Sequence, residues 1–227
     1  MILKNIVLFI SFFNKKIHGI NRRLNEKITI CELLNSKVKF NPSKCRFRGR
    51  TYLDINKGSD ITIGDYFIAN SGVNGGIDCG NGCKIAVQKG AKLIIGEYSG
   101  MTNTIIQCHE EIIIGNHVNI GAGCMIMDSN FHSTDWRDRL DRRKDIENHI
   151  NAPIKIGDVV FIGARSIICK GVTIGDHAMI AAGSVVVVMY PLMRFGEETL
   201  QSLLRISNYS GSYDRNIITF AIYNFLY

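Results

Sequence analysis

The sequence predicts an all-β solenoid, a coil of parallel strands with a triangular cross-section. The first observation is a run of branched aliphatic residues six apart, at Ile156, Ile162, Ile168, Ile174, Ile180 and Val186. The second is that Gly157, Gly163 and Gly175 directly follow three of them. The spacing fits neither a helix, with a period near 3.6, nor a plain strand, with a period of 2. A triangular coil requires it, because each flat side uses six residues.

The same period continues towards the N-terminus. Further apolar residues at this step are Ile55, Ile61, Phe67, Val73, Cys79, Ile85, Ile114, Ile120 and Ile126. Three sides make one turn of the coil, so residues eighteen apart, such as Ile156 and Ile174, should lie one above the other. Small residues should occupy the tight corners. We expect this repeat domain to cover residues 40–188.

Residues 1–39 are expected to form a helical segment that caps one end of the coil, since solenoid ends need covering. The apolar run over residues 6–13 is too short to span a bilayer as a helix. Basic residues follow this run, and no small-residue cleavage site does, which argues against a secretory signal. The alternative is an interfacial helix that lies on the anionic inner membrane leaflet.

Charge and cysteine content narrow the partners and the compartment. The formal net charge of +7 and the pI near 9.1 favour an anionic partner. No Lys/Arg cluster alternates with aromatic residues, so nucleic acid is not expected as a partner. Seven cysteines, an odd number among apolar repeat positions, indicate small buried side chains in a reducing cytosol, and hence a cytoplasmic protein. No second Cys or His pair completes a zinc site with Cys79 and Cys83.

One interruption of the repeat stands out. Over residues 128–153, which we call the ejected loop, the period vanishes and the composition turns polar. This loop carries Trp136, the only tryptophan of the chain, and His132 directly after Phe131. A coil that needs only corner turns has no structural use for such a loop, so we expect it to carry function.

The repeat, the loop sequence Asp-Ser-Asn-Phe-His-Ser and the stretch GDVVFIGARSIICKGVTIGDHAMIAAGSVV resemble the hexapeptide-repeat acyltransferases. The nearest branch is that of sugar O-acetyltransferases from bacterial polysaccharide gene clusters, and the resemblance covers residues 50–188. It implies a left-handed parallel β-helix and a homotrimer. It also implies transfer from acetyl-CoA, bound in the groove between subunits, to a sugar hydroxyl of a surface polysaccharide or its precursor, without a metal.

The resemblance makes His132 the general base. An imidazole is suited to accept the proton of a sugar hydroxyl as that hydroxyl attacks a thioester. Asp128 or Asp135 would orient the other ring nitrogen or bind substrate, and the sequence does not choose between them. His109 stands beside Glu110 and either lines the same cleft or is a structural residue. Of the remaining histidines, we expect solvated corners for His117 and His177, and a surface position for His149.

Five further residues match binding positions of the family, and each has a structural alternative. Asn103 matches an acceptor-side or oxyanion-side asparagine, or it is a corner residue that bonds its own backbone. Phe161 stands where relatives carry a tryptophan that packs on the coenzyme, or it is a core aromatic. The small residues expected to contact the pantetheine arm, or simply to fit corners, are Gly163, Ala164 and Ala182.

The resemblance stops after Val188, and residues 189–227 look aberrant. Family members continue with a tail that closes over the coenzyme. Suitable codons for Met189–Arg205, read with a preceding G and shifted by one nucleotide, encode DVPANEIWGGNPAKFIK, which is that tail. We therefore expect a frameshift near codon 188 and a poorly ordered tail.

Two other functions remain open on the sequence. An inactive trimeric scaffold, or the product of a pseudogene, is favoured by the altered tail. A zinc enzyme like the γ-type carbonic anhydrases shares the fold and would need three histidines from neighbouring subunits, for which His109, His117 and His132 supply the residue type.

Overall fold

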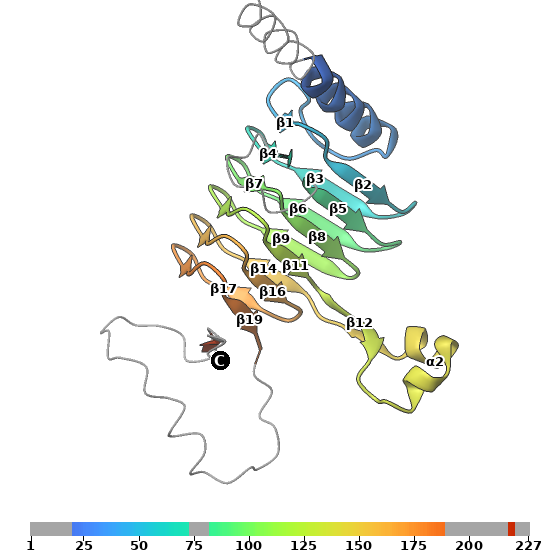
Figure 1. Cartoon of the computed structure of the whole chain (residues 1–227). Helices are drawn as coiled ribbons and strands as arrows, with labels where there is room; N and C mark the ends of the chain where they lie inside the picture. Colours follow the sequence, from blue (N-terminus) through green and yellow to red (C-terminus); the bar gives the residue numbers. More distant parts are fainter. Residues whose placement is uncertain (1–19, 73–81, 189–217, 221–227) are drawn as a thin grey trace, which may run out of the picture.

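The repeat folds into a coil with three flat faces, shown by a computed structural model that describes residues 20–72, 82–188 and 218–220 (Figure 1). Each face is one sheet, and consecutive strands of a face come from consecutive turns of the coil, so that their pairing is parallel. The three faces are here named A, B and C. Between Ile105 and Val187 the chain passes through them in the repeating order C, A, B.

The strands divide among the faces as follows. Face A consists of β3 (Asp60–Ile63), β6 (Lys92–Ile95), β9 (Glu111–Ile114), β14 (Ile154–Ile156) and β17 (Thr173–Ile174). Face B consists of β1 (Arg46–Arg48), β4 (Ile68–Asn70), β7 (Gly100–Thr102), β10 (Asn119–Ile120), β15 (Phe161–Ile162) and β18 (Met179–Ile180). Face C consists of β2 (Tyr52–Ile55), β5 (Lys84–Val87), β8 (Ile105–Cys108), β11 (Met125–Met127), β16 (Ile167–Cys169) and β19 (Val185–Val187).

The six-residue aliphatics fill the interior, as predicted. All six residues from Ile156 to Val186 at this step are at most 6% exposed. Ile156 pairs with Ile174, so residues eighteen apart do stack. Of the N-terminal positions, Ile61, Phe67 and Ile85 are buried and Ile55 is half-buried. Val73 and Cys79 lie outside the described residues.

The A–B edge shows why corners need special residues. A Cβ on Gly96 would lie 2.4 Å from the carbonyl oxygen of Gly115, so only glycine allows this approach of two turns. Two positions later the chain adopts positive φ, at Tyr98 and at His117. Their rings stack with centroids 5.0 Å apart. His117 and His177 are exposed at this edge, in agreement with the expectation of solvated corners.

Residues 20–35 form a helix that packs on the first turn of the coil (Figure 1). Its residues Thr29 and Leu33 are fully buried, on the side that faces the coil. The guanidinium of Arg50 donates to both carboxylate oxygens of Glu32, at 2.6 and 2.8 Å, and so fixes the helix to the strand region. This helix covers the N-terminal end of the core.

The ejected loop leaves the coil between β11 and β14. β11 ends at Met127 and β14 begins at Ile154. At the other end, β20 (Ile218–Phe220) pairs antiparallel with β19. The rest of the segment expected to be aberrant, residues 189–217 and 221–227, lies outside the described residues.

Cysteines of the described part are free thiols. Cys45, Cys83, Cys108 and Cys124 are buried, Cys169 is half-buried and Cys31 is exposed. Burial raises the pKa of the Cys83 and Cys108 thiols, which keeps them protonated and unreactive.

Candidate active site

The ejected loop is an ordered hairpin with a helical tip. Strand β12 (Ser129–Ser133) pairs antiparallel with β13 (His149–Asn151). Between them lie the short 3-10 helix η2 (Asp138–Leu140) and the helix α2 (Arg142–Glu147). The carboxylate of Asp141 accepts from the backbone N–H groups that begin α2, as an N-cap residue does. The polar sequence thus builds a platform outside the coil (Figure 1).

His132 lies on β12 and is held by a carboxylate from α2. Its Nδ1 is 2.7 Å from Oδ2 of Asp145, whose Oδ1 accepts from the backbone N–H of Ser133 at 2.8 Å. The His132 side chain is 69% exposed and that of Asp145 only 14%. The hydrogen bond with His132, followed by that from Ser133, lowers the pKa of Asp145. One ring edge is therefore fixed while the imidazole stays accessible.

Neither of the two expected aspartates holds His132, and this corrects the sequence analysis. Asp128 is fully buried and accepts from the backbone N–H groups of His109 and Glu110, at 2.7 and 2.8 Å. Asp135 forms an ion pair with Arg137 at 2.8 Å. Asp128 thus anchors the base of the loop to the neighbouring turn, and Asp145 is the carboxylate that orients the imidazole.

The base of the loop carries a cluster of rings. His109 contacts Phe131 and His149 edge-to-face, with centroids 5.1 and 5.9 Å apart. Burial lowers the pKa of His109; His149 adds to this, while Asp128 acts in the opposite direction. His149 is half-buried rather than on the surface as expected, because β13 places it over His109.

Phe131 connects this cluster to His132. Its φ of 62° lies in the left-handed region, which a bulky residue adopts only when its surroundings hold it there. The holding contacts are the ring of His109 and the Oγ of Ser129, which accepts from the Phe131 N–H at 2.9 Å. This turn sets the direction in which the next residue, His132, leaves the strand.

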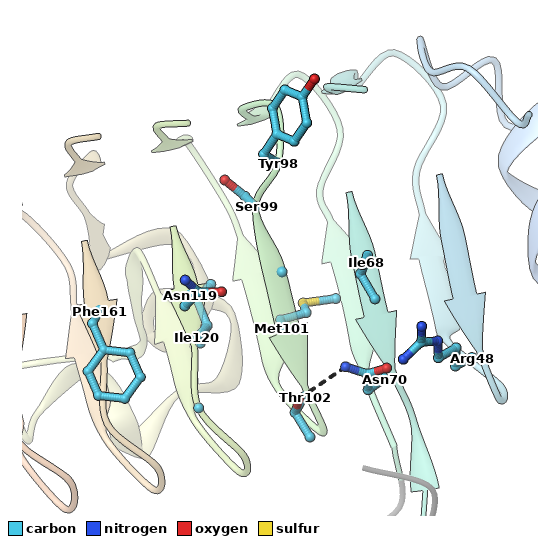
Figure 2. A pocket seen from close by; sticks show the side chains of 12 residues that line it. Arg48, Ile68, Asn70, Tyr98, Ser99, Met101, Thr102, Asn119, Ile120 and Phe161 are labelled. Atoms are coloured by element: carbon cyan, nitrogen blue, oxygen red, sulfur yellow. Dashed lines mark hydrogen bonds between the residues drawn. The ribbon is translucent and has the colours of Figure 1, made fainter. Parts of the chain in front are cut away.

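A second feature is a hollow of about 230 Å³ on face B (Figure 2). Phe161 and Asn119 lie side by side along it, in register with Gly100. Gly100, which has no side chain, also lines the hollow. Phe161 is 47% exposed, which argues against the alternative of a core aromatic. Arg48 stands at the far end of the hollow.

The residues expected to contact the coenzyme lie close together, in the last two turns. Phe161 is on β15, and Gly163, Ala164 and Ala182 follow at the B–C edge. A Cβ on Gly163 would lie 2.4 Å from the backbone nitrogen of Ala182, so packing between turns is already a sufficient reason for glycine.

Asn103 lies at the same B–C edge, several turns towards the N-terminus. It is buried with φ 43°; its Oδ1 accepts from the Gly72 N–H at 2.7 Å, and its Nδ2 donates to the Gly72 carbonyl at 3.2 Å. Asn103 is thus a corner residue, but the backbone that its side chain bonds is that of Gly72 in the preceding turn and not its own as the alternative had it. Within one chain, the structure does not bring Asn103 or the coenzyme set to His132, which extends from the C–A edge.

In the described part of the chain, no group of three His, Cys, Asp or Glu side chains is placed to hold a metal ion. His117 and His132 lie at different edges of the coil.

Comparison with known proteins identifies the repeat. Residues 153–187, from β14 to β19, match the family described as the hexapeptide repeat of succinyl-transferase. These residues form a hexapeptide repeat. Together with the three parallel sheets, this makes the fold a left-handed parallel β-helix.

Several solved structures are similar. One is a hexapeptide-repeat-containing acetyltransferase from Vibrio cholerae, 35% identical over 41% of this chain and 50% of that one, with a TM-score of 0.37. The same enzyme complexed with acetyl coenzyme A is 22% identical over 60% and 64% of the two chains, with a TM-score of 0.35. AntD, an N-acyltransferase from Bacillus cereus in complex with dTDP and coenzyme A, is 16% identical over 70% and 85%, with a TM-score of 0.40. This chain spans half the length of the first structure.

Proposed function

We propose that this chain is an acetyl-CoA-dependent O-acetyltransferase of the cytoplasm. It acts on a sugar hydroxyl of a surface polysaccharide or of its precursor, with His132 as general base. The observation that carries the proposal is the accessible imidazole of His132 held by Asp145 on a loop ejected from a hexapeptide-repeat coil. The choice of a sugar acceptor rests on the resemblance over residues 50–188.

The hydrogen bond between His132 and Asp145 determines which ring nitrogen of His132 acts as the base. Because the pKa of Asp145 is lowered, its carboxylate is ionised near neutral pH and only accepts hydrogen bonds. The proton between the two groups therefore sits on Nδ1, and Nε2 of the neutral ring carries the free lone pair. An oriented base of this kind needs no covalent enzyme intermediate, since the thioester is already activated.

We propose that the acetyl transfer then proceeds in two steps. The acceptor hydroxyl gives its proton to Nε2 of His132 as its oxygen bonds to the acetyl carbonyl carbon. The C–S bond breaks next, and the departing sulfur of coenzyme A takes the proton from Nε2. The products are the acetyl ester and the free thiol, and His132 returns to its starting state.

A site between copies of the chain follows from the placement of the two residue sets. His132 extends from the C–A edge, whereas Phe161, Gly163 and Ala182 lie on face B and at the B–C edge. One acetyl-CoA that contacts both sets bridges two protomers. A homotrimer provides this contact three times around a three-fold axis.

Titration with acetyl-CoA by calorimetry, followed by an acceptor screen, tests the proposal. We expect binding of acetyl-CoA, and release of thiol that depends on a mono- or oligosaccharide or a nucleotide sugar, with the product heavier by one acetyl group. Absence of acetyl-CoA binding would contradict the proposal. Binding without transfer to any acceptor would favour the inactive trimer that the altered C-terminal sequence also suggests.

A further inference from the structure

The helix over residues 20–35 has an outer side that the coil does not cover. Its apolar residues stand three or four apart, which places them along one side of a helix. We call this set the outer stripe: Ile20, Leu24, Ile28, Cys31 and Leu34. Ile20, Leu24 and Leu34 are each more than 50% exposed. The opposite side, with Thr29 and Leu33, is the one buried on the coil.

Basic residues border the outer stripe. Arg23 and Lys27 are exposed and follow Ile20 and Leu24 by three residues, which places Arg23 at the edge of the stripe and Lys27 within it, between Ile20 and Leu34. The acids of the helix point elsewhere: Glu32 binds Arg50 on the coil, and Glu26 is half-buried. The first 35 residues contain six Lys or Arg and two Glu, and so carry +4 of the net charge of +7.

We propose that the outer stripe docks on an anionic membrane surface, with the helix lying in the plane of the interface. An apolar stripe flanked by cations is the pattern of helices that bury one side at the boundary of headgroups and acyl chains. Each Lys or Arg beside an anionic surface strengthens such binding. The contact we propose is a peripheral one. Among the described residues, no helix is long and apolar enough to cross a membrane.

A second copy of the chain fits this surface less well. Pairing two outer stripes would bring Arg23 and Lys27 of one helix towards the same cations of the other, without an exposed acid on that side to compensate. The sequence that precedes the helix is also apolar and basic, with the run over residues 6–13 followed by Lys15 and Lys16. The charge of the whole region therefore matches lipid phosphates better than a like-charged helix.

Vesicle flotation of the full chain tests the proposal. The probes are vesicles of phosphatidylcholine alone and of phosphatidylcholine with a quarter phosphatidylglycerol. We expect binding to the second kind only, weakened by salt as exposed charges are screened. Leu24→Asp should weaken it by about tenfold, since it removes one buried apolar side chain and adds a repelled charge. The matched control is Leu140→Asp, which changes a still more exposed leucine of the ejected loop and should bind like the wild type.

Each possible result of the flotation experiment either supports or overturns the membrane proposal. Circular dichroism and light scattering on the same samples establish that the variants fold and assemble alike; should Leu24→Asp not fold, Arg23→Gln with Lys27→Gln replaces it, with the same expected loss. Equal flotation of the wild type and the stripe variants would overturn the proposal. So would equal binding to vesicles with and without phosphatidylglycerol. A third contradicting result is a wild type that does not bind vesicles together with a stripe variant of altered oligomer size. The outer stripe would then be covered by a second copy of the chain.

Discussion

The imidazole of His132 and the carboxylate of Asp145 meet at 2.7 Å although their positions are thirteen apart in the sequence. The contact depends on the hairpin of β12 and β13 and on the helix α2, which brings Asp145 back over His132. The same carboxylate binds the Ser133 N–H, so one side chain both closes the loop and orients the candidate base.

The first prediction concerns this carboxylate. Asp145→Asn should lower kcat by about 100-fold or more, because the amide does not hold the ring in the tautomer with a free Nε2 lone pair. The KM for acetyl-CoA should change little, and the pH profile of kcat should shift, which a purely structural role would not cause. Asp60→Asn, which removes an exposed carboxylate paired with Lys39, serves as the control. A normal kcat with an unshifted pH profile in Asp145→Asn would remove the positioning role.

The second prediction is the pH dependence of loop closure. The pKa of Asp145 is lowered in the folded loop, so its stabilising effect is fully present above the unfolded value of about 3.9 and is lost as pH falls through the folded value. Hydrogen exchange of the Ser133 amide, corrected for intrinsic rates, measures this. Protection should persist down to about pH 4 and fall below it. In Asp145→Asn the protection should be lower at neutral pH and should lack this acid step.

Much of the core was predictable from sequence because the six-residue step falls on inward positions, although buried residues off that step, such as Val160 and Val172, were not marked by it. Ile156 and Ile174, chosen by that step alone, are buried and paired. The hand of the coil was not predictable from spacing, since a triangular coil of either hand has the same period; the resemblance supplied it.

The partner of His132 was not predictable for a different reason. The ejected loop contains several aspartates, and distance along the chain favoured Asp128 and Asp135 over Asp145. Which of them reaches the imidazole depends on the pairing of Ser133 with His149 and on where α2 begins. One available signal was Asp141, a helix-capping residue type placed four residues before Asp145.

A third prediction separates the two sides of β15. Ile162→Ala should lower the free energy of unfolding by about 2–5 kcal/mol, because the side chain is fully buried in the coil. Phe161→Ala, on the exposed side, should cost far less stability but raise the KM for acetyl-CoA. Urea melts and steady-state kinetics measure both. A Phe161 variant with unchanged KM would show that this ring does not contact the coenzyme.

Subunit complementation gives the fourth prediction. His132→Ala and Phe161→Asp should each be nearly inactive alone. Refolded together, they should regain activity in proportion to the mixed trimers, because some sites then receive His132 from one copy and Phe161 from another. Mixtures no more active than the sum of their parts would place both residues in one subunit's site.

The C-terminal sequence yields a fifth prediction. Replacing the residues after Val188 with DVPANEIWGGNPAKFIK should tighten the binding of acetyl-CoA, if this tail closes over the coenzyme as the resemblance to the hexapeptide-repeat acyltransferases implies. Calorimetry on both chains measures this. Equal affinity would show that the tail does not matter, and resequencing the gene across codon 188 tests the frameshift itself.

We propose His132 as the base of an acetyl transfer. The most direct measurement is the acceptor-dependent release of coenzyme A by the wild type and by His132→Ala, with His177→Ala, an exposed histidine at the A–B edge, as the control. We predict a loss of about 100-fold or more in His132→Ala, with unchanged acetyl-CoA binding and trimer size, and full activity in the control. Undiminished turnover in His132→Ala would show that His132 is not the base.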